Sequence, residues 1–222
     1  MNKFYHSAAF VMLLLVCLFS DHSFAQSFKK GSLTVSLSEG TTYSTFSTNT
    51  TTPSGNERYA GNITGNRDPI TIEYGLTNHW GLGLNMGGDF YNADPSKYYN
   101  FQTPTNSIKV YTTEFTLDAN YHFFVTRHFD LAGFLSVGPA SVFFKGSADD
   151  RPYQYTAGGF ILRTGTKARY YITKRFGVMG MVSTFITQCS TAGEKGNTVG
   201  NNTTTTLKGS AIEFGPCYRI LR

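Results

Sequence analysis

Stretches of alternating apolar and polar residues recur along the chain. In residues 32–38, the apolar side chains Leu33, Val35 and Leu37 are separated by hydroxyl residues. In residues 111–123, aromatic and apolar residues occupy one parity, and Thr, Glu, Asp, Asn and His occupy most of the other. Because successive side chains of a β-strand point to opposite faces, this pattern predicts strands with one apolar and one polar face.

About eight such stretches follow one another, and the connections between them alternate between long and short. The expected strands cover 32–38, 70–76, 80–91, 111–123, 129–145, 155–172, 176–190 and 204–221. Short turns are expected at 77–79, 125–128 and 173–175, and long polar loops at 39–68, 92–107, 147–154 and 191–203. Gly138-Pro139 predicts a bulge or kink in the fifth strand, because proline cannot donate to a ladder.

The first 25 residues have the pattern of a secretory signal peptide. Lys3 precedes an apolar run over 8–19, and Ser23 and Ala25 occupy the −3 and −1 positions of a cleavage site before Gln26. The run is shorter than the ~20 residues of a spanning helix. The expected organisation is therefore a signal peptide over 1–25 and one outer-membrane β-barrel domain over 26–222.

Strand number and loop parity together predict closure. An open sheet of eight strands leaves two edges of unpaired backbone groups, and in lipid no water is present to satisfy them. The short turns and both chain ends fall on one side of the sheet, and the long loops fall on the other, as short periplasmic turns and longer extracellular loops do. The predicted fold class is an all-β, eight-stranded antiparallel up-and-down transmembrane β-barrel.

The last predicted strand contains a pattern of polar residue, glycine, two residues, apolar residue, any residue and apolar residue, over 208–214. In layout and in this pattern the chain resembles the small eight-stranded outer-membrane β-barrel proteins of the OmpA and OmpX kind, including PorT-like barrels. The resemblance implies that the pattern acts in membrane insertion and that the protein lies in the outer membrane of a Gram-negative cell envelope. It implies outer-membrane lipid and the barrel-insertion machinery as partners.

Aromatic residues near the short turns predict one boundary of the membrane. Trp and Tyr favour the interface between lipid and water, so a periplasmic girdle is expected there. Its members are Trp80, Tyr121, Phe123, Tyr170, Phe176 and Tyr218.

The polar faces predict a self-neutralising interior. An eight-stranded barrel is only wide enough to hold its own side chains, and an unpaired charge there is costly. Counting back from the short turns places Glu114 near Arg163, and Asp118 near Lys167. The full structural ion network is expected to comprise Glu73, Glu114, Asp118, Arg163, Lys167, Arg169 and Glu213.

Other chemistry finds little support in the sequence. No Ser-centred nucleophile motif occurs, so no enzyme is expected, and the dispersed His79, His122 and His128 suggest no metal site. No cofactor is expected. The net charge of +5 comes from scattered cations, which argues against nucleic-acid binding. Cys189 and Cys217 would lie roughly 40 Å apart along the ladder, too far for a disulfide.

The expected function is that of a non-enzymatic outer-membrane barrel. Its external loops, chiefly 39–68 and 92–107, would bind a surface ligand or an envelope protein, or shield the cell surface. One alternative is a narrow porin-like channel or a subunit of a secretion or transport assembly. Another is a soluble exported calycin-like barrel, with its apolar face turned inward around a small apolar ligand.

Overall fold

The computed structural model describes residues 27–52, 55–93, 108–148, 151–192 and 202–220. The predicted signal peptide lies outside these residues. No helix long and apolar enough to cross a membrane occurs among them.

Ten strand segments make up the described chain. They are β1 (Leu33–Leu37), β2 (Glu39–Thr52), β3 (Gly55–Arg67), β4 (Ile70–Gly75), β5 (Trp80–Ala93), β6 (Ile108–Val125), β7 (Phe129–Ala148), β8 (Arg151–Tyr171), β9 (Phe176–Ala192) and β10 (Asn202–Ile220). Every pairing between them is antiparallel.

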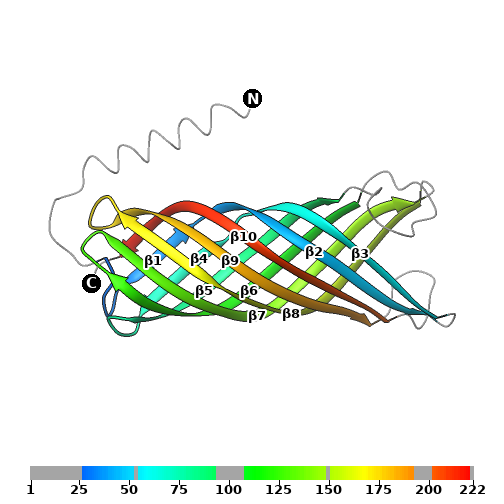
Figure 1. Cartoon of the computed structure of the whole chain (residues 1–222), viewed down its shortest axis with the longest axis horizontal. Coiled ribbons are helices and arrows are strands. Elements are labelled where there is room, and N and C mark those ends of the chain that lie inside the picture. Colours follow the sequence, from blue (N-terminus) through cyan, green and yellow to red (C-terminus); the bar gives the residue numbers. More distant parts are fainter. Residues whose placement is uncertain (1–26, 53–54, 94–107, 149–150, 193–201, 221–222) are drawn as a thin grey trace, which may run out of the picture.

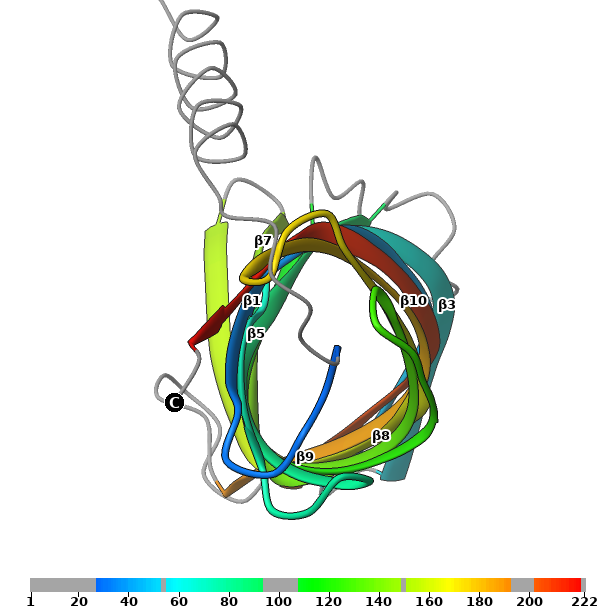
Figure 2. The same ribbon diagram turned by 90° about the vertical axis from the view of Figure 1, so that its left-hand side faces the viewer.

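The ten segments form the eight continuous strands of a closed barrel, which we call staves. The first stave is β1 with β2, the second is β3 with β4, and each of β5 to β10 is one stave. β1 and β2 pair with β10 in one continuous register, interrupted opposite Gly215 and Pro216. β3 and β4 likewise share one register against β5, interrupted at Asp68 and Pro69. The first stave pairs with the last, which closes the ring (Figures 1 and 2). The predicted fold class is confirmed.

The outer wall is apolar over most of its length. Phe115 is 45% exposed and Leu117 53%, whereas the side chains of alternate parity, such as Glu114, are buried. The same holds on every stave, where exposed Leu, Val, Ile, Phe and Tyr alternate with buried residues. Such a surface requires hydrocarbon around it. The calycin-like alternative, which needs these side chains inside, is wrong.

The region 39–68 is a correction to the predicted long loop. It folds into the hairpin β2–β3, which pairs with β10 on one side and β5 on the other. Its outward residues, such as Thr45 and Asn49, are polar, so the hydrophobic alternation that marks a lipid-facing strand is missing. The many β-branched threonines still suit a strand.

The three other loop predictions have different outcomes. The predicted loop 147–154 is mostly strand, because β7 continues to Ala148 and β8 begins at Arg151. The predicted loops 92–107 and 191–203 lie largely outside the described residues, between β5 and β6 and between β9 and β10. The three predicted short turns are confirmed.

Of the predicted bulge or kink at Gly138-Pro139, the bulge is wrong. The register of β6 with β7 is the same on both sides of Pro139, although Phe115 and Thr116 have no ladder partner opposite it. Proline there removes a donor without adding a residue to the strand. The register shift between these strands lies at His122 to Phe124.

Candidate functional site in the barrel lumen

The lumen is the part of the molecule where charged residues gather, and small residues on β5 make room for them. Gly81, Gly83 and Gly87 alternate along the inward face of this strand. A Cβ atom at Gly83 would lie 3.2 Å from Asp118 Cβ and 3.3 Å from Asn120 Nδ2. Because these glycines have no side chains, residues of β6 can occupy the space beside β5.

Arg67 lies at the centre of one group of ion pairs. Its Nε donates to Glu213 at 2.9 Å, its Nη1 lies 3.5 Å from Asp89, and its Nη2 pairs with Glu114. Arg163 reaches the other oxygen of Glu114 at 2.9 Å. This Arg67 cluster (Arg67, Asp89, Glu114, Arg163, Glu213) joins five staves and is buried from solvent. A planar guanidinium with several donors suits such multiple pairing.

A second group lies closer to the short turns. His122 on β6 sits between two carboxylates, with Nε2 2.7 Å from Glu73 and Nδ1 2.6 Å from Asp130. Arg169 also joins these two acids, at 3.2 Å to Asp130 and by a contact to Glu73, and Lys167 Nζ lies 3.7 Å from Glu73. This is the His122 cluster (Glu73, His122, Asp130, Lys167, Arg169).

Asp118 and several uncharged polar side chains of the lumen belong to neither cluster. Asp118 accepts a hydrogen bond from Thr116 at 3.1 Å. Among the described residues, the side-chain amide of Asn120, Asn85 Oδ1 and Ser136 Oγ are buried without a protein partner. This part of the lumen is the least internally paired.

Above the Arg67 cluster, toward the extracellular end, the lumen holds a layer of apolar side chains beside buried hydroxyl residues such as Thr48 and Thr205. The largest members come from several staves, and the rings of Phe46 and Phe144 have centroids 5.0 Å apart. The apolar layer comprises Phe46, Ile63, Tyr91, Val110, Ala140, Val142, Phe144, Ala157, Ile161, Phe185, Cys189 and Leu207. The Arg163 guanidinium lies over the Phe185 ring at 4.6 Å, where the charged and apolar layers meet.

The opposite end is covered by the segment before β1. The Phe28 ring stacks on His122 at 3.4 Å between centroids. Ser27 Oγ donates to the carbonyl oxygens of Thr126 at 2.6 Å and Phe129 at 2.9 Å. Figure 2, which looks into this end, shows the blue segment crossing the barrel opening.

The seven lumen residues predicted from sequence are all buried, but their pairing follows the stagger of the barrel. Glu114 does pair with Arg163. Lys167, expected near Asp118, lies instead beside Glu73 and 5.0 Å from the centre of the Phe134 ring. Strand tilt displaces residues that are level when counted from the turns.

Five of the six predicted girdle aromatics are exposed on the outer wall. They are Trp80, Tyr121, Phe123, Tyr170 and Tyr218. Phe176 differs, because it is only 7% exposed. It is the first residue of β9, directly after the turn.

Sequence reasoning missed several central residues. The predicted network lacks Arg67 and Asp89, because Arg67 lies in a predicted loop and Asp89 lies close to one. It also lacks His122 and Asp130, the latter at the start of β7. Arg67 and Thr71 occupy the same alternate positions as the inward-facing Glu73. Extending this alternation back along the chain would have identified Arg67 as an inward-facing cation.

Within the described part of the chain, no group of His, Cys, Asp and Glu is arranged to hold a metal ion. Cys189 and Cys217 are buried, free thiols. A depression of about 380 Å³ in the wall is lined by residues of both faces, including Met86, Glu114 and Pro139. The chemistry that the two lumen clusters show is charge pairing between buried side chains.

Comparison with known proteins identifies the fold. No family model and no curated protein sequence matches the chain. Among solved structures, it is similar to the outer membrane protein OprG of Pseudomonas aeruginosa, with a TM-score of 0.57 and 14% identity, covering 88% of this chain and 98% of that one. It is also similar to the outer membrane protease OmpT of Escherichia coli, with a TM-score of 0.51 and 10% identity, covering 90% and 99%. With its apolar outer wall, this chain is a transmembrane β-barrel of the outer membrane.

Proposed function

We propose that this outer-membrane barrel is a closed, non-enzymatic protein that acts through its extracellular wall and loops, by binding a partner or by shielding the cell surface. The observation that carries the proposal is the filled lumen. The His122 cluster, the Arg67 cluster and the apolar layer occupy successive levels, and Phe28 covers the periplasmic opening.

The composition of the outer wall supports the surface role. Toward the extracellular end the outward side chains of β2 change from Tyr43 to Thr45, Ser47 and Asn49. Thr45 Oγ1 donates to Asn62 across the hairpin at 3.1 Å, on the outside of the barrel. A polar wall of this kind extends out of the hydrocarbon into water, where it can meet other molecules.

The non-enzymatic part of the proposal is supported by the way the lumen carboxylates are used. Glu114 binds two arginines, and Glu73 binds Arg169 and His122. Structural pairing therefore accounts for these groups without catalysis. OmpT is named as a protease, so an assay with unfolded casein is a fitting check, and the protein is expected to leave casein intact.

Planar-bilayer recording tests the closed state. The reconstituted protein, whose insertion is verified by a gel shift on boiling, is expected to give no regular conductance steps. Steps of constant size and ion selectivity would support the narrow-channel alternative and contradict the closed barrel.

Cysteine labelling tests the surface role in intact cells. Because the thiols of Cys189 and Cys217 are buried, Asn49→Cys is expected to react with a membrane-impermeant maleimide from outside. The matched variant Arg127→Cys, on a short turn, is expected to react only after the outer membrane is permeabilised. The reverse result would place the polar wall in the periplasm.

A further inference from the structure

The three short turns repeat one local structure. Each has the sequence threonine, any residue, His or Arg, and then Trp or Phe. In each turn the threonine Oγ1 accepts a hydrogen bond from the amide of the aromatic residue. The bonds are Trp80 to Thr77 at 2.9 Å, Phe129 to Thr126 at 3.0 Å and Phe176 to Thr173 at 2.9 Å. A side-chain oxygen that holds the backbone in this way gives a tight, defined turn.

Each turn is also attached to the end of the strand that follows its hairpin. The third turn residue accepts a backbone hydrogen bond of 2.7 Å, from His122 to His79, from Tyr171 to His128 and from Arg219 to Arg175. In the first two turns the histidine Nδ1 donates to a carbonyl oxygen on the same strand at 3.0 Å. The turns are therefore fixed parts of the barrel rim.

This rim carries charge of one sign. The described residues 27–32, 76–80, 124–129 and 172–176 contain Lys29, Lys30, Arg127, Lys174 and Arg175, and no Asp or Glu. We call these five residues the cationic rim. The acids nearest to it, Glu73 and Asp130, are buried in the His122 cluster and do not offset the rim at its surface.

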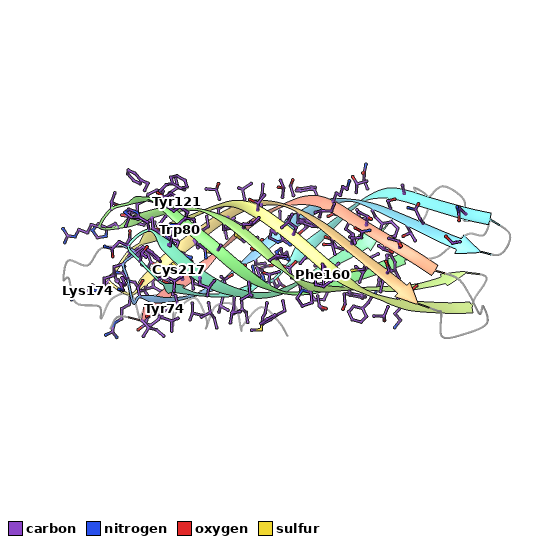
Figure 3. All side chains as sticks on the ribbon, turned by 90° about the horizontal axis from the view of Figure 1, so that it is seen from below. Tyr74, Trp80, Tyr121, Phe160, Lys174 and Cys217 are labelled. Carbon is purple, nitrogen blue, oxygen red and sulfur yellow. The ribbon has the colours of Figure 1, made fainter. Side chains whose placement is uncertain are left out.

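The cationic rim directly adjoins the aromatic girdle. Trp80 and Tyr121 pack together at 4.9 Å on the outer wall, and both are about half exposed. Figure 3 shows Lys174 at the tip of the barrel, just beyond Trp80 and Tyr121. Because Trp and Tyr lie at the level of lipid headgroups, the rim cations lie where the phosphates of the periplasmic leaflet would meet them.

We propose that the cationic rim is a binding surface for anionic phospholipid headgroups of the periplasmic leaflet. Arginine and lysine near an anionic membrane surface are attracted to it, and a guanidinium can bind a phosphate through two hydrogen bonds. The rigid turns present several cations around one circumference, so the barrel retains a shell of anionic lipid. This inference concerns the rim alone and is independent of what the extracellular wall binds.

Native mass spectrometry tests the proposal. The protein is released from nanodiscs that contain equal amounts of phosphatidylglycerol and phosphatidylcholine with identical acyl chains, and the retained lipids are counted. We expect the wild type to retain phosphatidylglycerol preferentially. In the variant Arg127→Gln/Lys174→Gln/Arg175→Gln the preference is expected to fall roughly tenfold or more, since each cation contributes separately.

The matched control removes three exposed cations from the extracellular half. Lys109→Gln/Lys145→Gln/Lys208→Gln changes the net charge equally and is expected to keep the wild-type preference. If both variants lost the preference for phosphatidylglycerol equally, net charge alone would explain it, and the proposed rim site would be wrong. A wild type without lipid preference would also contradict the proposal.

Two further arms identify the ligand. Inorganic phosphate added at the concentration of the lipid is expected not to displace phosphatidylglycerol, and displacement would point to free phosphate as the ligand. Purified peptidoglycan is expected to bind the wild type and the rim variant equally. If peptidoglycan binding depended on the rim and no phospholipid were preferred, the ligand of the rim would be the cell wall and the lipid proposal would be wrong.

Discussion

The two halves of the lumen are filled by different kinds of side chain. Near the short turns the inward residues of β6 are Asp118, Asn120 and His122, whereas toward the extracellular end those of β7 are Ala140, Val142 and Phe144. The outward residues Leu135 and Val137 on the same strand are apolar. Lipid dictates the outer face, while the inner face needs only to fill space and leave no charge unpaired.

The difference predicts different sensitivity to substitution. In the charged half, each group is stable only while its partners are present, because a buried charge that loses its counterion is costly. In the apolar half, the cost of a change follows the volume that is removed. The following three substitutions separate these cases, in order of expected effect.

Removing Arg67 should have the largest effect. Arg67→Met leaves Asp89, Glu114 and Glu213 facing one another without their common cation, and we expect a loss near the upper end of about 3–5 kcal/mol in the free energy of unfolding. Urea unfolding in lipid vesicles, followed by the fluorescence of Trp80, measures it. Adding Glu114→Gln and Glu213→Gln should recover much of the loss. No recovery would mean that the cluster does not act through charge.

Removing Phe46 tests the apolar half. Phe46→Ala deletes a ring that packs on Phe144 in the apolar layer, and a loss of about 3 kcal/mol is expected in the same unfolding measurement. The matched control is Phe160→Ala, because Phe160 is 70% exposed on the outer wall and leaves no internal cavity. Equal losses at the two positions would show that the layer is not tightly packed.

Filling the space on β5 should cost less. Gly83→Leu places a side chain where Asp118 and Asn120 lie, and overpacking of this kind costs about 1–3 kcal/mol. Gly158→Leu is the control, since an added Cβ there meets nothing within 4 Å, and a change of at most about 0.5 kcal/mol is expected. If both variants unfold alike, the lumen beside Gly83 is more open than its contacts indicate.

Much of the wall could be predicted from sequence, because lipid imposes a period of two on every strand that crosses it. Phe115 and Leu117 on one parity and Glu114 and Asp118 on the other were sufficient to orient β6. The hairpin β2–β3 could not be found in the same way, since its outer face meets water and its threonines carry no apolar alternation.

The lumen was less predictable, for a geometric reason. Parity shows which residues point inward, but the tilt and stagger of the staves decide which of them meet. Lys167 therefore lies beside Glu73 and not beside Asp118. The aromatic stacking of Phe28 on His122 depends on a short segment that precedes the first strand and has no strand pattern of its own.

That segment has a consequence for the order of assembly. Phe28 rests on β6, and Ser27 bonds to the turn between β6 and β7, although both residues directly precede the first stave. Their binding site is formed only after β6 and β7, from the middle of the chain, have folded into the barrel. Although Ser27 and Phe28 are synthesised before any strand, they must therefore be among the last residues to reach their final positions. A folded domain fused next to them would keep Phe28 from covering the periplasmic end of the lumen.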